Sequence, residues 1–437
     1  MMPTLRTAFV FALAYIGLSA AKAAEPYLVA DAQTGEVLMQ KDASEPWFPA
    51  STTKLMTVYV ALNAAHDGRL TMDTPLRVSA RAFRAPPSKM GFRPGTLVTL
   101  DNALKMLMVK SPNDIAVTVA EGVSGSVEAF AMEMNATAKK LGMRESHFVN
   151  PNGLHSEDHY SSARDMAILA RALLKDFPEQ TGLYSIGALQ LGDKIIRNHN
   201  GLIGRYPGAD GMKTGFTCPA GWNVVATAER PGRRLIVVVF GSPSPRMRTN
   251  EAAMLFDRGF AMSGTGQMLD ALPASAVTEP PNMRDAICRG RGKAAMIAMQ
   301  EDFVASAVAE SSAAFMTGRV GLPMVASAMA APPAAGDIAD EKVSFEPTPV
   351  FIGAKPGWTG PVMAARGGSA DEQETSPVSA YSAQKEAKPV EAEGAKAVLK
   401  SVVKPPVRLR GAHLTPEARA RKTAASKRVA TRKTQRP

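Results

Sequence analysis

Residues 222–240 read W-N-V-V-A-T-A-E-R-P-G-R-R-L-I-V-V-V-F. Two apolar runs, 222–228 and 234–240, are separated by a charged turn that contains Pro231 and Gly232. Val and Ile are frequent in both runs, as is typical of strands that pair in the middle of a sheet. The stretch therefore predicts two adjacent antiparallel strands.

The rest of the foldable region surrounds this pair. Residues 26–30 and 36–39 flank a turn at 31–35 and predict a second hairpin near the other end. Apolar periodicity predicts helices that begin near 51 and span 100–108, 127–141, 161–175 and 250–261. Because strands stand at both ends and helices between them, we expect an α+β fold, with an antiparallel sheet flanked by helices and an all-helical subdomain.

Composition divides the chain of 437 residues into four parts. Residues 1–24 are predicted to be a signal peptide and residues 25–264 a folded domain, which contains the three motifs described below. Residues 265–330 form an Ala- and Met-rich segment of uncertain structure, in which 294–316 could form a helix. From 331 to 437, Ala, Pro, Ser, Glu and Lys dominate, which predicts a largely disordered tail.

The N-terminus predicts export. Arg6 precedes a short apolar run at 8–18, and Ala21, Ala23 and Ala24 offer a cleavage site of the A-x-A kind. A run of that length favours removal over membrane anchoring. We expect a periplasmic or cell-envelope protein.

The formal net charge of +11 lies almost wholly in the tail. Residues 404–437 contain eleven Lys and Arg residues against the single acid Glu417, an excess of ten. This location argues against nucleic-acid binding by the folded part. The tail could contact an anionic membrane or the cell wall, or it could simply be solvated.

Two cysteines occur, Cys218 and Cys288. Export would permit a disulfide, but the two lie in different regions and the sequence does not pair them. We expect packing as a small side chain to be the role of Cys218, rather than a response to oxidants.

The sequence S-T-T-K at residues 51–54 opens a predicted helix. Three-residue spacing places the hydroxyl of Ser51 and the amine of Lys54 on one helical face, where a neutral lysine could activate the serine. The same spacing recurs at Ser382–Lys385 and Ser401–Lys404 in the predicted disordered tail, so the pattern alone is weak.

Two further elements follow the first motif in order. Ser111-Pro112-Asn113 is the single S-x-N of the chain, and Lys213-Thr214-Gly215 is its single K-T-G. The S-P-N element can place a hydroxyl and an amide beside Lys54. The K-T-G element can bring a cation and a hydroxyl to a substrate carboxylate, and its glycine lets the backbone approach closely. The three motifs together indicate serine acyl transfer.

These motifs resemble those of the penicillin-recognising serine enzymes. The flanking residues narrow the likeness to the D-alanyl-D-alanine carboxypeptidase family of low-molecular-mass penicillin-binding proteins. The similar stretches span residues 49–57, 88–91, 111–114, 150–155, 161–167 and 208–217. The likeness covers about residues 26–262 and implies the DD-peptidase/β-lactamase-like fold.

The resemblance implies a role for each matched residue. Ser51 would form the acyl-enzyme, Lys54 would accept its proton and Ser111 would shuttle protons. Asn113 would position the substrate amide, and Lys213, with Thr214, would bind the terminal carboxylate. The backbone N–H groups of Ser51 and Phe216 would form the oxyanion hole. Stem peptides of peptidoglycan would be the substrates, and β-lactams would be acylating inhibitors.

Several features depart from the family or point elsewhere. Pro112 stands where many relatives have a small residue, and neither the following β-sheet domain nor an amphipathic C-terminal anchor is evident. The histidines lack metal-ligand spacing, so neither a metal nor another cofactor is expected. Asp165 and Asp210 are predicted to make structural hydrogen bonds. The histidines in question are His147, His155, His159 and His199.

The leading hypothesis is a serine-type D-Ala-D-Ala carboxypeptidase. A D,D-endopeptidase that cuts cross-links could use the same site, and the motifs barely distinguish the two. No glutamate stands in an evident motif for the rapid deacylation of a β-lactamase. A non-catalytic cell-wall scaffold and a polyanion-binding tail are the rivals from other classes. Oligomeric state is left open.

Overall fold

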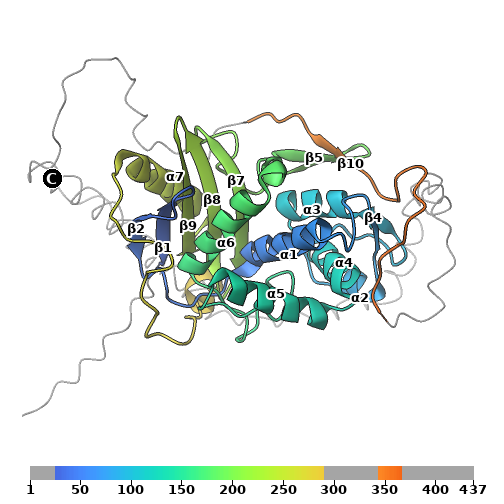
Figure 1. Cartoon of the computed structure of the whole chain (residues 1–437), viewed down its shortest axis with the longest axis horizontal. Coiled ribbons are helices and arrows are strands. Elements are labelled where there is room, and N and C mark those ends of the chain that lie inside the picture. The colour runs from blue at the N-terminus through green and yellow to red at the C-terminus, as the bar shows by residue number, and fades with distance from the viewer. Residues whose placement is uncertain (1–24, 290–342, 367–437) are drawn as a thin grey trace, which may run out of the picture. The chain divides into compact units, whose positions relative to one another are not determined.

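The two apolar runs at 222–240 form the predicted pair of strands in a computed structural model, which describes residues 25–289 and 343–366 (Figure 1). Strands β8 (Gly221–Arg230) and β9 (Arg233–Ser242) are antiparallel and lie inside a five-stranded sheet. The strand order is β2-β1-β9-β8-β7, and every neighbouring pair is antiparallel. The remaining strands are β1 (Tyr27–Asp31), β2 (Val37–Lys41) and β7 (Ala209–Thr217).

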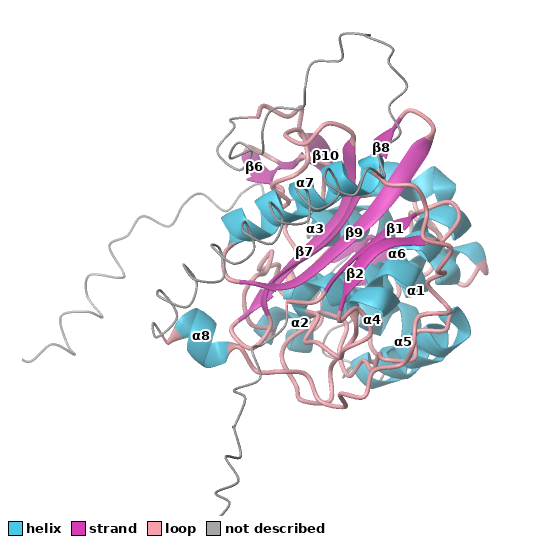
Figure 2. Cartoon of the chain, turned by 90° about the vertical axis from the view of Figure 1, so that its left-hand side faces the viewer, coloured by secondary structure: helices cyan, strands magenta, loops and turns pink. Residues whose placement is uncertain are grey.

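Alternating side chains of the central strands pack on opposite sides of the sheet. Ile236 and Val238 of β9 join the larger apolar cluster with helices α1 (Lys54–His66) and α6 (Ala163–Asp176). Val237 and Val239 join a second cluster with α7 (Pro245–Ala261). Figure 1 shows α7 on one side of the strands and α6 with α1 on the other, and Figure 2 shows α7 lying across the sheet. This arrangement confirms the predicted α+β class.

A helical part packs beside the sheet and contains most of the other elements. Helices α3, α5 and α6 begin where the side chains of Thr99, Ser126 and Ser162 accept a hydrogen bond from the first turn, whereas α4 begins after Pro112 without such a cap. Gly142 ends α5 with φ of +77°, at the residue where the sequence predicted the end. The elements are η1 (Ala50–Thr53), α2 (Ala80–Arg84), α3 (Leu100–Val109), α4 (Asn113–Ser124), α5 (Val127–Leu141), η2 (Pro178–Leu183), β3 (Pro75–Arg77), β4 (Leu97–Thr99), β5 (Ala188–Leu191) and β6 (Lys194–Arg197).

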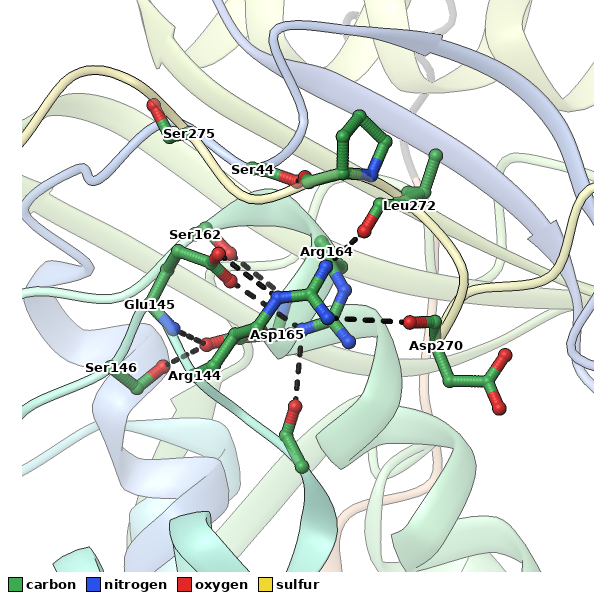
Figure 3. Close-up of polar contacts among 12 residues, drawn as sticks. Ser44, Arg144, Glu145, Ser146, Ser162, Arg164, Asp165, Asp270, Leu272 and Ser275 are labelled. Atoms are coloured by element: carbon green, nitrogen blue, oxygen red, sulfur yellow. Dashed lines mark hydrogen bonds and ion pairs between the residues drawn. The ribbon is translucent and has the colours of Figure 1, made fainter.

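The described structure continues past residue 264, where the sequence-based domain was expected to end. Leu269, Leu272 and Met283 are buried against the domain. Polar groups fix this segment. The fully buried Arg164 donates from Nε to the carbonyl of Leu269 at 2.8 Å. Arg144 donates to the carbonyls of Asp270 and Leu272 (Figure 3). Residues 265–289 are therefore part of the folded domain, and the carbonyl of Leu269 satisfies a donor of Arg164 that would otherwise be buried without an acceptor.

A disulfide joins Cys218 to Cys288 across a sequence separation of 70 residues. It links the β7–β8 turn to α8 (Arg284–Cys288). The unpaired packing role expected for Cys218 is therefore wrong. Separation along the chain hid the pair from the sequence, whereas the backbone hydrogen bond from Met283 N to Pro219 O at 3.0 Å brings the two segments together.

Loss of this disulfide should destabilise the domain. Closing a loop of this length removes conformational entropy worth about 4 kcal/mol from the unfolded chain. We expect dithiothreitol to lower the denaturant midpoint of the oxidised protein, by an amount that corresponds to about 2–4 kcal/mol of unfolding free energy. The Cys218→Ser/Cys288→Ser variant should already show the lower midpoint and should not respond to the reductant. Equal midpoints for the oxidised and reduced wild-type protein would contradict the prediction.

Residues 343–366 differ from the expectation of disorder after residue 331. Strand β10 (Thr348–Val350) adds to β5 in parallel, in a three-stranded sheet of order β10-β5-β6. Further along, Gly353 N donates to Leu97 O at 2.7 Å, and Met363 exchanges backbone hydrogen bonds with Pro75 and Arg77. Residues 343–366 (orange in Figure 1) thus form hydrogen bonds with backbone groups at the edges of short strands.

Some predictions fall outside the described residues. These are the signal peptide at 1–24, the helix at 294–316 and the basic tail at 404–437. Within the described ranges, no single helix has both the length and the apolarity of a membrane span, although α4 and α5 meet that criterion jointly as a pair bent by 82°.

Candidate active site

Ser51 lies in η1, the tight turn that leads directly into α1. The preceding Ala50 has φ of +49°, in the left-handed region that residues other than glycine rarely adopt. Asn223 of β8 fixes the approach to this turn, because its Nδ2 donates to the carbonyls of Phe48 and Pro49 at 2.9 and 3.2 Å. The sheet therefore imposes a conformation on the serine turn that the local sequence alone would not favour.

The backbone of β7 runs against this turn at Gly215. A Cβ added to Gly215 would lie 2.9 Å from Pro49 O and 3.0 Å from Ser51 N. Only glycine permits so close an approach of two backbones. The amide of Ser51 and the strand that carries Phe216 are thus neighbours, as the predicted oxyanion hole requires.

Lys54 is fully buried one turn after the serine, and its amine contacts three oxygens. Nζ lies 3.0 Å from Ser51 Oγ, 2.9 Å from Asn113 Oδ1 and 2.6 Å from the carbonyl oxygen of Asn152. The structure therefore brings together the predicted nucleophile, the predicted base and one residue of the second motif. The three contacts fix the direction of the amine towards the hydroxyl.

Burial holds the pKa of the Lys54 amine well below its usual range, because the charged form loses its hydration. The positive charge of Lys213 lowers the pKa further, whereas the carboxylate of Asp114 opposes the shift. An amine with a depressed pKa is neutral in a larger fraction of molecules near neutral pH, and a neutral amine accepts a proton. The environment of Lys54 thus suits the predicted role of this residue as a general base.

Ser111 precedes α4 and has φ of +61°, a second left-handed non-glycine residue at this site. Its side chain is buried, and Oγ is without a hydrogen-bond partner within the described structure. A buried hydroxyl without a partner is costly and is concentrated at functional sites. Ser111 therefore offers an uncommitted hydroxyl to a substrate.

Asn113 is committed within the protein. Its Nδ2 donates to the carbonyls of Pro86 and Pro87 at 3.0 and 3.2 Å, while Oδ1 accepts from Lys54. In this structure the side chain therefore joins the loop before Ser88 to the lysine. Its predicted contact with a substrate amide stays a prediction.

The third motif lies on β7. Lys213 is buried, and its Nζ donates to the carbonyl of Thr214 at 2.9 Å. Burial lowers the pKa of Lys213 to about 7, and the charge of Arg248 contributes in the same direction. Thr214, Gly215 and Phe216 line the adjacent cavity, whereas Lys213 lies behind its wall.

A cavity of about 600 Å³ opens in front of Ser51, within the size range of ligand sites. Phe216 and Trp222 form one wall, with stacked rings 4.0 Å apart between centroids. Lys110, His199 and Arg248 supply basic groups, and no Asp or Glu belongs to the lining. The cavity is therefore suited to a peptide that carries a negative charge.

Sequence reasoning missed three contributors to the site. The carbonyl of Asn152 directs Lys54, and Arg248 and His199 line the cavity. Asn152 lies within one of the family-like stretches, which could have singled it out. Arg248 lies in α7, outside every recognised motif, and no sequence signal marks it.

The other candidates have structural partners. His159 accepts at Nδ1 from Val149 N and contacts Thr53 Oγ1 through Nε2 at 2.8 Å, and burial lowers its pKa to about 3. Asp165 pairs with Arg164 at 2.6 Å and Asp210 with Arg234 at 2.9 Å. Among the described residues, no group of three or more His, Cys, Asp or Glu side chains is arranged for a metal ion.

The sequence profile of the D-alanyl-D-alanine carboxypeptidase family matches residues 17–244, more than half of the chain. The chain belongs to this family. It is 38% identical over 246 residues to the D-alanyl-D-alanine carboxypeptidase DacF of Bacillus subtilis. The aligned residues cover 55% of this chain and 63% of that protein. It is 32% identical over 251 residues to the D-alanyl-D-alanine carboxypeptidase DacB2 of Mycobacterium tuberculosis. Here the aligned residues cover 55% of this chain and 83% of that protein.

Solved structures of low-molecular-mass penicillin-binding proteins share the fold of this D-alanyl-D-alanine carboxypeptidase family member. Penicillin-binding protein 5 from Haemophilus influenzae is 35% identical to this chain, and its structure matches with a TM-score of 0.53. The superposed residues cover 55% of this chain and 71% of that one. Penicillin-binding protein D2 from Listeria monocytogenes, in its cefotaxime-bound form, is 29% identical and matches with a TM-score of 0.50. The superposed residues cover 55% of this chain and 97% of that one. The chain spans less than two thirds of the first curated relatives' length, at 63%, 64% and 61%.

Proposed function

We propose that the protein is a serine-type D-Ala-D-Ala carboxypeptidase that trims stem peptides of peptidoglycan through an acyl-enzyme at Ser51. The observation that carries the proposal is the buried Lys54 amine, 3.0 Å from Ser51 Oγ, beside a cavity with basic and no acidic lining residues. Membership of the D-alanyl-D-alanine carboxypeptidase family supports the choice of substrate.

The first half-reaction uses the groups in front of the cavity. Neutral Lys54 takes the proton of Ser51 Oγ as the oxygen bonds to the carbonyl carbon of the penultimate D-Ala. The amides of Ser51 and Phe216 stabilise the oxyanion, and loss of one such donor costs about 3–4 kcal/mol in the transition state. The C–N bond then breaks, and terminal D-Ala leaves with a proton that passes from Lys54 through Ser111.

The second half-reaction releases the shortened peptide. A water molecule gives a proton to Lys54 and attacks the acyl carbon, and Ser51 Oγ recovers a proton as it leaves. A β-lactam would acylate the same serine, as the cefotaxime-bound relative suggests. Lys213, Thr214 and Arg248 would attract the terminal carboxylate, with Lys213 acting through its charge from behind the wall.

The proposal includes location and domain organisation. Removal of residues 1–24 on export would leave a catalytic domain that begins near residue 25 at the cell envelope. The basic tail would contact anionic membrane or cell wall, since its excess charge of ten favours polyanions.

The choice between carboxypeptidase and endopeptidase needs two substrates. The full chain from residue 25 is offered a soluble pentapeptide that ends in D-Ala-D-Ala and, separately, a cross-linked peptide dimer, with free D-Ala and monomer measured by chromatography. We expect D-Ala release at least tenfold faster than dimer cleavage. Prior treatment with penicillin should stop both reactions. Faster cleavage of the dimer would make the protein an endopeptidase, and turnover of neither substrate would reject the proposed enzyme.

A further inference from the structure

A second cavity, of about 380 Å³, lies away from Ser51 at the other end of the sheet. Three segments form it: the turn after β1, which contains Gln33; the last two turns of α6; and the turn between β8 and β9. Its volume falls within the range of small-ligand sites. Four cations line it, Arg171, Lys175, Arg233 and Arg234, together with the single acid Glu229.

Two of the four cations are neutralised by carboxylates. Arg233 donates from Nε to Asp31 Oδ2 at 2.9 Å. Arg234 pairs with Asp210 at 2.9 Å and also with Glu229. Glu229, the acid in the lining, is therefore already paired with Arg234, and the charges of Arg233 and Arg234 are compensated within the protein.

The other two cations have no carboxylate partner within the described residues. Arg171 and Lys175 are four residues apart on α6 and so share one face of the helix. Arg171 donates from Nη2 to the carbonyl of Gln33 at 2.9 Å, which positions the guanidinium but leaves its charge uncompensated. The cavity thus presents two cations that a ligand could neutralise.

Two of the arginines that line this cavity also have an unsatisfied hydrogen-bond donor. Nε of Arg171 and Nε of Arg234 are both buried without a hydrogen-bond partner in the described structure. Both belong to side chains that line the same cavity. Each Nε is covered by protein atoms, so it does not itself contact a ligand in the cavity. These unsatisfied donors show that the guanidinium groups of the cavity are incompletely partnered, and an oxyanion is the ligand that guanidinium groups suit best.

We propose that this cavity is a second binding site, for a carboxylate-bearing peptide, in which the charges of Arg171 and Lys175 neutralise the carboxylate. The choice of a cell-wall stem peptide as that ligand rests on the proposed function. The site would hold a neighbouring stem peptide that is not itself being cleaved.

The position of the cavity suits such a role. Thr214, which lines the first cavity, pairs with Val224 on β8, and Glu229 of the second cavity lies five residues further along the same strand. At about 3.4 Å per residue, these two lining residues of β8 and its partner are separated by about 17 Å along the strand. A polymer that carries repeated stem peptides could occupy both sites, and the second contact would raise the effective concentration of D-Ala-D-Ala ends at Ser51.

Binding is tested with a ligand that is not a substrate. The full chain with Ser51→Ala is titrated with a stem tripeptide that lacks both D-Ala residues and, separately, with inorganic phosphate, by isothermal calorimetry. Adding Arg171→Gln and Lys175→Gln should weaken tripeptide binding at least tenfold. The matched control is Lys139→Gln with Lys194→Gln, which removes two exposed lysines from α5 and β6 and should leave binding unchanged.

Each other outcome rejects the site as proposed. Equal tripeptide binding by the Arg171→Gln/Lys175→Gln chain would place the ligand elsewhere, and no binding would remove the site. Binding of phosphate but not of the tripeptide would replace the assigned ligand. With Ser51 intact, the Arg171→Gln/Lys175→Gln chain should release D-Ala more slowly from insoluble peptidoglycan but at an unchanged rate from the soluble pentapeptide. Because the titration needs no catalysis, its result stays separate from the proposed reaction.

Discussion

Ser51→Ala is expected to abolish covalent labelling by a fluorescent penicillin and to lower D-Ala release by about 10,000-fold or more. In the proposed reaction the hydroxyl oxygen of Ser51 forms the acyl bond, and alanine leaves the buried Lys54 with no hydroxyl to deprotonate. The neighbouring contacts of Lys54 with Asn113 and Asn152 remain, so the fold should persist. Gel fluorescence after a timed incubation measures the label, and circular dichroism verifies the fold.

The chain supplies its own control for this variant. Ser382 stands in a second S-x-x-K sequence, 382–385, outside the described residues. Ser382→Ala should label like the wild-type protein. Undiminished labelling of Ser51→Ala would mean that another nucleophile carries the reaction, and an unlabelled but folded wild-type chain would remove the acyl-enzyme altogether.

Lys54→Met should lower the acylation rate by about 100- to 10,000-fold, the usual contribution of a general base. Methionine keeps an unbranched side chain of similar length in the buried position and removes only the proton acceptor. The corresponding change in the tail, Lys385→Met, should have no effect. Stopped-flow measurement of penicillin acylation gives the rates. A loss of less than tenfold in Lys54→Met would assign the base to another group.

The same lysine should shape the pH profile of acylation. The rate should rise with pH as Lys54 loses its proton, and because burial lowers its pKa, the rise should occur well below the range of an exposed lysine. Above about pH 7, Lys213 loses the charge that attracts the carboxylate, and the rate should fall. Lys213→Arg keeps a charge to higher pH, so it should move the falling limb upwards. A falling limb at the same pH in that variant would exclude Lys213 as its cause.

The fold was predictable where local pattern and burial agree. β8 and β9 are apolar runs around a Pro-Gly turn, and α5 ends at the glycine that the sequence marks. β7 was missed because its residues, including Asp210, Gly211 and Gly215, do not favour a strand; pairing with β8 overrides that preference. The attachment of residues 343–366 depends on edges of short strands, which no local pattern in that segment reveals.

The site was predictable to the extent that it is local. Spacing along one helix turn predicts the contact of Lys54 with Ser51, which the structure shows at 3.0 Å. The carbonyl of Asn152 and the guanidinium of Arg248 reach the site through tertiary packing, from parts of the chain 98 and nearly 200 residues away from Lys54 and Ser51. A backbone carbonyl also carries no signal in its side chain, so sequence types alone could not single it out.

The pairing of β1 with β9 sets an order of events for a newly made chain. Val29 pairs with Val237, so the N-terminal hairpin has no partner strand until more than two hundred further residues exist. Contacts between such distant segments slow folding, because a long loop must close before the contact forms. A chain synthesised from its N-terminus therefore carries its serine motif unfinished until β9 arrives. Penicillin should not label a nascent chain that ends just before residue 233, although all three motifs precede that residue.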